Sequence, residues 1–131
     1  VHADVPDVRP YMAQSAVMVI PLRVGGGTRL KMLEAAAAGV PVVSTTIGAE
    51  GLSLERGLHY LAADGAPELV AKLHQALAAP DSLRALAESA RRHVAQHYDW
   101  SSLATKLERV WMDCVEQHRK LAPSAGKGGS P

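Results

Sequence analysis

A pattern of strand, glycine-rich turn, helix and strand across residues 16–46 places the strongest constraint on how this chain can fold. It opens with a short apolar segment, residues 17–20, which is rich in β-branched side chains and suits a strand buried on both faces. Three glycines at residues 25–27 follow, and residues 28–38 are then mostly strong helix formers. A second apolar strand begins at Val42. This order predicts a βαβ unit with parallel strands and a right-handed crossover.

The helix predicted at residues 28–38 has a recognisable face and a recognisable end. Gly39 lies where a C-terminal cap is expected, and Pro41 prevents the helix from continuing. The apolar side chains spaced for one buried face are Leu30, Leu33 and Ala37.

The glycine-rich turn predicts a phosphate-binding site. It lies between the carboxyl end of a strand and the amino end of a helix, which is where open parallel sheets bind ligands. The free N–H groups and partial positive charge of a first helical turn attract phosphate, and Arg29 and Lys31 add charge beside it. The alternative is a flexible connection with two solvated basic side chains, and spacing alone does not decide between the two.

Two known phosphate-binding motifs are excluded by their spacing. A P-loop requires a Gly-Lys-Ser or Gly-Lys-Thr sequence, and none follows these glycines. A dinucleotide-binding fingerprint requires Gly-x-Gly-x-x-Gly; Gly25 and Gly27 fit it, but Leu30 occupies the third glycine position.

Several short motifs in this region match one family in combination: Pro-Leu-Arg at 21–23, Gly-Gly-Gly-Thr-Arg-Leu-Lys at 25–31, Leu-Glu-Ala at 33–35, Gly-Val-Pro-Val-Val-Ser-Thr at 39–45 and Gly-Ala-Glu-Gly-Leu at 48–52. With them the chain resembles the nucleotide-sugar half of GT-B glycosyltransferases, most closely the large retaining family called group 1 or family four. The resemblance implies a three-layer α/β fold, a truncated Rossmann-like domain with a parallel sheet that forms the C-terminal half of a GT-B fold.

The resemblance also implies that the glycine turn binds the diphosphate of a nucleotide sugar. Backbone N–H groups and the helix dipole would stabilise the charge of the leaving group. The residues assigned to the phosphates are Gly26, Gly27, Thr28 and Arg29. No carboxylate cluster is present to bind a metal, so the protein itself would replace the cation, and no cofactor is expected besides the substrate. Further side chains expected to border the crevice are Arg23, Lys31 and Glu50.

Glu34 matches the glutamate with which this family binds the ribose of the sugar nucleotide, and a carboxylate can accept both hydrogen bonds of a ribose diol. Without the resemblance, an exposed helix glutamate is the better interpretation. Glu50 could contact a ligand or be solvated, and the solvated interpretation is slightly favoured. Many family members carry two glutamates separated by seven residues; Glu34 matches the second, and the first contacts the donor sugar. Gly26 stands in its place here, which shifts that contact to backbone groups.

The remainder of the chain predicts a last short strand at residues 58–62, followed by three helices. The first covers residues 67–79 and ends at Pro80, with apolar positions Leu69, Val70, Leu73 and Leu77. The second has Asp81 as its N-cap and carries Leu83, Leu86, Ala87, Ala90 and Val94. The third is capped by Ser101 and carries Leu103, Leu107, Val110, Trp111 and Val115.

The domain organisation follows from these elements. Residues 1–121 are expected to form one partial nucleotide-sugar-binding domain, and the small, polar residues 122–131 a disordered tail. His93 and His97 have the spacing of a helical metal site, but no third ligand lies nearby in the sequence. A solvated basic face is therefore the favoured interpretation, and no metal is expected.

Composition excludes several classes of function. A net charge of +1 argues against strong electrostatic binding to nucleic acid or to a membrane surface. Cys114 is the single cysteine, so no internal disulfide is possible and a reducing, cytoplasmic compartment is expected, with the full-length protein peripheral to the inner membrane. No membrane-spanning segment or signal peptide is evident, and a first residue Val1 indicates a fragment of a longer protein.

We therefore expect the part of a retaining, metal-independent glycosyltransferase that binds the nucleotide sugar, acting in cell-surface polysaccharide synthesis. The alternatives are a non-catalytic α/β assembly or regulatory module and a GT-B-fold epimerase or phosphorylase. No catalytic residue is assigned, because no nucleophile–base or carboxylate pair is found, and the isolated chain is expected to be inactive. The acceptor domain would precede Val1. The exposed third helix, with Trp111, Met112 and Val115, predicts a homodimer.

Overall fold

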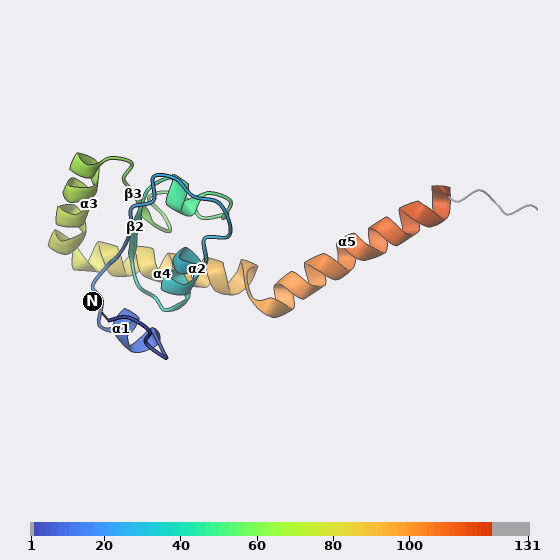
Figure 1. The fold of residues 1–131 in the computed structure, drawn as a ribbon, viewed down its shortest axis with the longest axis horizontal. Helices are drawn as coiled ribbons and strands as arrows, with labels where there is room; N and C mark the ends of the chain where they lie inside the picture. The colour runs from blue at the N-terminus through green and yellow to red at the C-terminus, as the bar shows by residue number, and fades with distance from the viewer. Residues whose placement is uncertain (1, 122–131) are drawn as a thin grey trace, which may run out of the picture. The chain divides into compact units, whose positions relative to one another are not determined.

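The computed structural model describes residues 2–121, which divide into two compact units. The first unit ends at Tyr98 and contains the sheet and its helices. The second begins at Asp99, and its described residues, up to 121, contain one helix (Figure 1). The predicted disordered tail, residues 122–131, lies outside the described residues.

The sheet confirms the predicted α/β fold. Its three parallel strands, β1 (Met18–Ile20), β2 (Val42–Ser44) and β3 (Leu61–Ala62), lie in the order β1-β2-β3. All three residues of β2 are buried, because this strand has a neighbour on each side. The expectation that the first strand is buried on both faces is wrong: β1 lies at an edge of the described sheet, and Val19 is 37% exposed.

Helix α2 (Leu30–Ala37) joins β1 to β2 and ends as predicted. Gly39 has φ of 72°, a left-handed conformation that glycine adopts without steric cost. Its N–H donates to Ala36 O at 3.0 Å, and the N–H of Val40 donates to Ala35 O at 2.9 Å. These two bonds form a Schellman motif that satisfies carbonyl groups at the end of the helix.

The predicted buried face of α2 is wrong at Leu30 and Ala37, which are exposed, whereas Leu33 packs partly buried against the core. Met32, Ala35 and Ala36 are buried, whereas Leu30 is 59% exposed. The helix begins later than predicted, after a non-helical Arg29, and its small side chains face helix α4 (Pro80–His97), against which α2 packs. Alanines allow the two backbones to approach closely, so burial here follows the fit between helices rather than the size of the side chains.

Helices α3 (Ala66–Ala78) and α4 follow β3, and α4 buries the five apolar residues predicted for it. In α3 the prediction is only partly correct, because Val70 and Leu77 are 55% and 60% exposed. Asp81 is not the N-cap of α4. The helix begins at Pro80, whose fixed φ and missing N–H suit a first helical position, and Asp81 instead pairs with Arg84 at 3.2 Å.

The two remaining short elements of the first unit are helix α1 (Arg9–Ala13) and the 3₁₀ turn η1 (Ile47–Ala49). The second unit is helix α5 (Trp100–Leu121), which begins before the predicted cap Ser101. The carboxylate of Asp99 accepts the N–H of Ser101 at 3.0 Å, so Asp99 caps this helix. None of its residues is buried, and none of the helices within residues 2–121 is long and apolar enough to cross a membrane.

Candidate functional site

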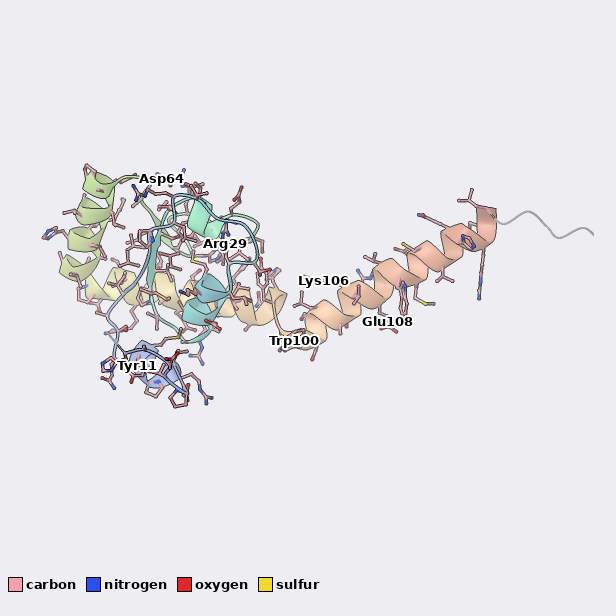
Figure 2. The ribbon with its side chains drawn as sticks, viewed as in Figure 1. Tyr11, Arg29, Asp64, Trp100, Lys106 and Glu108 are labelled. Carbon is pink, nitrogen blue, oxygen red and sulfur yellow. The ribbon has the colours of Figure 1, made fainter. Side chains whose placement is uncertain are left out.

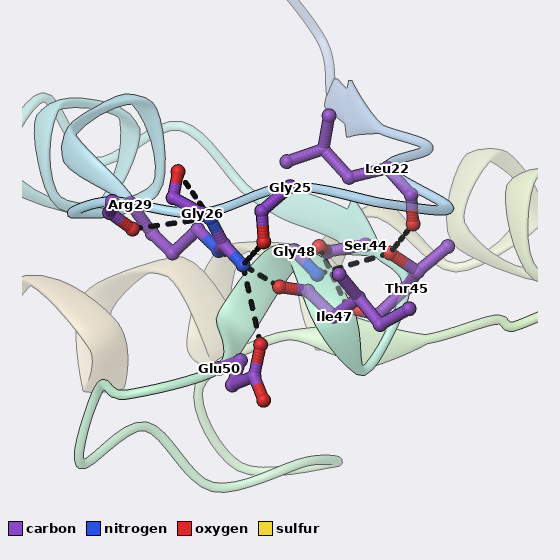
Figure 3. A network of polar contacts seen from close by, with 10 residues as sticks. Leu22, Gly25, Gly26, Arg29, Ser44, Thr45, Ile47, Gly48 and Glu50 are labelled. Carbon is purple, nitrogen blue, oxygen red and sulfur yellow. Dashed lines mark hydrogen bonds and ion pairs between the residues drawn. The ribbon is translucent and has the colours of Figure 1, made fainter.

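The carboxyl ends of β1 and β2 are joined by a network of polar contacts centred on Arg29 (Figure 3). Residues 25–29, which we call the glycine loop, form the last part of the connection from β1 to α2. Residues 45–50, which contain η1, follow β2. These contacts therefore lie at the carboxyl end of the parallel sheet, where the sequence predicts a phosphate site.

Arg29 is buried, with 7% of its side chain exposed. Its Nε–H donates to Ile47 O at 2.8 Å, and its two terminal nitrogens bond to the loop and to Glu50. Nη1 donates to the carbonyls of Gly26 and Gly27 at 3.2 and 3.1 Å, and Nη2 to Gly25 O at 3.0 Å and Glu50 Oε2 at 3.3 Å. Four carbonyl dipoles and one carboxylate thus compensate the buried positive charge.

These bonds turn the loop carbonyls toward Arg29. Gly27 has φ of 84°, which reverses the chain direction just before the helix. Within the described part of the chain, the backbone N–H groups of Gly27, Thr28 and Arg29 have no hydrogen-bond partner. The first helical turn consequently presents unsatisfied N–H groups, the arrangement that attracts anions.

A second set of contacts holds the segment after β2 against the end of β1. Thr45 Oγ1 donates to Leu22 O at 2.6 Å and accepts the N–H of Gly48 at 3.0 Å. Ser44 is fully buried, and its Oγ bonds to Ile20 O at 3.3 Å and Thr45 O at 3.0 Å. Gly48 packs so closely here that a Cβ would overlap Ser44 Oγ. Sequence reasoning missed this layer, although a glycine shortly after a strand was a signal for close backbone approach.

The structure brings most of the predicted phosphate residues to one cleft. Gly26, Thr28, Arg29 and Lys31 border a cleft of about 460 Å³ between the end of β1 and the start of α2. Glu34 is exposed on α2 and borders an adjacent cleft of about 390 Å³, which Lys31 also lines. The two clefts therefore meet at Lys31.

The other predicted crevice residues have different surroundings. Arg23 is exposed and lines a separate cleft of about 340 Å³ with Asp64. Glu50 is 69% exposed at its side chain and pairs with Arg29. Asp64, labelled in Figure 2, was not singled out by the sequence. Its carboxylate accepts the N–H and Oγ1–H of Thr46 at 2.6 and 2.7 Å. The bond from the Thr46 backbone lowers the pKa of the Asp64 carboxyl below its ordinary value, and the side-chain bond adds to this.

The predicted solvated face holds for His97, which is exposed, but not for His93. His93 is half-buried, and its ring lies 4.4 Å from that of His59 and 4.2 Å from that of His97. Burial lowers the pKa of His93, and the charges of its two histidine neighbours lower it further. Ser53 Oγ lies 3.0 Å from His93 Nε2. Across residues 2–121 no group of three or more His, Cys, Asp or Glu is arranged to hold a metal ion.

Comparison with known proteins gives one match. A family model described as "Glycosyl transferases group 1" matches residues 1–96, which is most of the chain and nearly all of the first unit. No curated protein and no solved structure matches the chain.

Proposed function

Because the chain belongs to the group 1 glycosyl transferases, we propose that it binds the nucleotide-diphosphate sugar for a retaining, metal-independent transferase. The observation that carries this proposal is the glycine loop. Its carbonyls are bonded to Arg29, and the N–H groups of Gly27, Thr28 and Arg29 are left for a ligand. The diphosphate would lie on these N–H groups, at the amino end of α2.

The proposed role of the glycine loop follows from where negative charge develops during sugar transfer. Breaking the bond between the sugar and the diphosphate leaves negative charge on the phosphate oxygens, and fixed N–H dipoles stabilise that charge without reorganising. Gly26, Gly27, Thr28 and the backbone of Arg29 would supply these dipoles. Lys31 is exposed at the mouth of the same cleft and would add a mobile positive charge.

Glu34 would bind the ribose. It is exposed on α2, one turn beyond the start of the helix, and borders the cleft that adjoins the phosphate position. Its carboxylate has acceptor positions for both hydroxyls of a ribose diol. Glu50 would act mainly through its ion pair with Arg29.

We also propose that transfer requires an acceptor-binding domain that the chain itself does not supply, with an acceptor related to cell-surface polysaccharide. The exposed apolar side chains of α5 support a further contact, either with such a domain or with a second copy of the chain. The place of action would be the cytoplasmic side of the inner membrane.

Titration with nucleotide sugars tests the proposal. Glu34→Ala should weaken binding of the nucleotide sugar by about tenfold, since it removes hydrogen bonds to a charged acceptor. Glu88→Ala, at an exposed helix glutamate on α4, is the matched control and should bind as the wild type does. The titration should be repeated with uridine, guanosine and adenosine diphosphates to identify the base. Equal affinity of Glu34→Ala and wild type would exclude Glu34 from the site, and no binding by the wild type at millimolar concentrations would count against the proposal itself.

A further inference from the structure

We infer that the Arg29 side chain has a positioning role in the proposed sugar-nucleotide site: it fixes the glycine loop so that backbone N–H groups face the diphosphate, and its guanidinium does not itself contact the ligand. This inference rests on the proposed function. It gives Arg29 a different role from the direct phosphate contact that the basic side chain at this position first predicts.

The first argument is that the guanidinium has no donor left. An arginine side chain carries five N–H bonds, and the five acceptors around Arg29 lie 2.8–3.3 Å from its nitrogens. A phosphate oxygen could bond to it only by displacing one of these acceptors. Displacing one of the four carbonyls would leave that acceptor without its donor inside the fold. Displacing the exposed Glu50 carboxylate would set two anions in competition for a guanidinium whose side chain is only 7% exposed.

The second argument is the geometry of the loop. Three consecutive carbonyls, those of residues 25–27, converge on one guanidinium. When successive carbonyls point to one side, the following N–H groups are directed elsewhere, and those of Gly27 and Thr28 have no partner within residues 2–121. A lysine could not reproduce this arrangement, because its ammonium is a compact charge and lacks the planar fork of arginine.

The third argument is that Arg29 joins two segments that are distant in sequence. Its Nε–H bond reaches Ile47 and its Nη2 reaches Glu50, both in the segment after β2 (Figure 3). The glycine loop is therefore attached to the end of a buried central strand. The contact with Glu50 should contribute least, because that carboxylate is 69% exposed and screened by water.

The test is a titration of the ¹⁵N-labelled chain with inorganic pyrophosphate, followed by the backbone amide signals and the Nε–H signal of Arg29. We expect the Gly27 and Thr28 amides to shift while the Arg29 Nε–H signal stays protected and unmoved. Arg29→Lys keeps the charge but should weaken pyrophosphate binding by about tenfold or more, as expected for losing the bonds that shape the site. Arg84→Lys is the matched control, because Arg84 is an exposed arginine on α4 that pairs with the exposed carboxylate of Asp81.

The outcomes separate the inference from the proposed function. If the Arg29 Nε–H signal shifts together with the Gly27 amide, or if Arg29→Lys binds pyrophosphate as the wild type does, the inference is overturned. If the wild-type amides do not respond to pyrophosphate, the proposed phosphate site fails and Arg29 is only a structural residue. The signals of the buried Val43 and Ala90 report whether Arg29→Lys folds; should it not, the wild-type Nε–H titration alone decides.

Discussion

Replacing Gly48 by alanine should destabilise the first unit more than its single added methyl group suggests. A Cβ at this position would overlap Ser44 Oγ and would lie 3.1 Å from both the Cγ2 and the carbonyl oxygen of Ile20. Ser44 is fully buried, and Gly48 does not have a positive φ, so the effect would come from space alone.

The magnitude follows from two terms. Forcing Ser44 Oγ out of its position loses one net hydrogen bond, about 1 kcal/mol. Inserting a methyl group into a closely packed site adds about 1–3 kcal/mol. The expected loss is therefore about 2–4 kcal/mol, a large share of the roughly 5–15 kcal/mol by which a domain is stable.

Urea denaturation followed by far-UV circular dichroism measures this loss. Both tryptophans, Trp100 and Trp111, lie in the second unit, so their fluorescence would not report on the first. Gly26→Ala is the control for stability, because nothing lies within 4 Å of its added Cβ. The double variant Ser44→Ala with Gly48→Ala should recover part of the lost stability, because Ser44→Ala removes the oxygen that the new Cβ would overlap. A Gly48→Ala protein within about 0.5 kcal/mol of the wild type, a typical surface effect, would refute the reasoning.

Three further outcomes are expected. The pKa of His93 in the folded chain is lowered by burial and by the charges of His59 and His97. The folded chain therefore binds fewer protons at this residue than the unfolded chain does. The contribution of neutral His93 to stability is present above pH 6.5, the ordinary pKa, and is lost as the pH falls through the lower folded pKa. Urea titrations should give a lower free energy of unfolding at pH 5.5 than at pH 7.5, and the difference should be smaller in His93→Gln. An equal difference in the variant and the wild type would contradict this role of His93. The apolar face of α5, where Trp111 is 73% exposed, should support self-association that Trp111→Ser weakens; purely monomeric light scattering at high concentration would exclude this. The purified chain should not transfer sugar, because transfer needs both substrates held in reactive geometry; turnover in a product assay would show that the chain contains catalytic groups we have treated as structural.

Much of the fold could be predicted from periodic patterns and end signals. The alternation of apolar and helix-forming segments predicted the parallel strands, Gly39 marked the end of α2, and the apolar spacing in α4 identified its buried residues. The face of α2 could not be predicted in the same way. The side of α2 that is buried is the one whose alanines fit against α4, and α4 lies about 50 residues further along the chain.

The place of the candidate site in the fold could be predicted from the sequence, but the contacts within it could not. The three glycines between a strand and a helix indicated where an anion could bind. The direction of the Arg29 side chain depends on the carbonyl of Ile47 and on Glu50, which no local pattern connects to it. The grouping of His59 with His93 likewise depends on the loop after β2 folding back onto α4.

The attachment of the glycine loop to Arg29 has a consequence for the kinetics of ligand binding. Glycines lose more conformational freedom than other residues when they are fixed, at about 1–2 kcal/mol per residue. Because the bonds that fix residues 25–27 join groups of the chain itself, this entropy is lost during folding and not again on association. A ligand should then meet a loop already in its binding conformation. The observed association rate should rise linearly with ligand concentration, without the plateau that a slow loop rearrangement would impose.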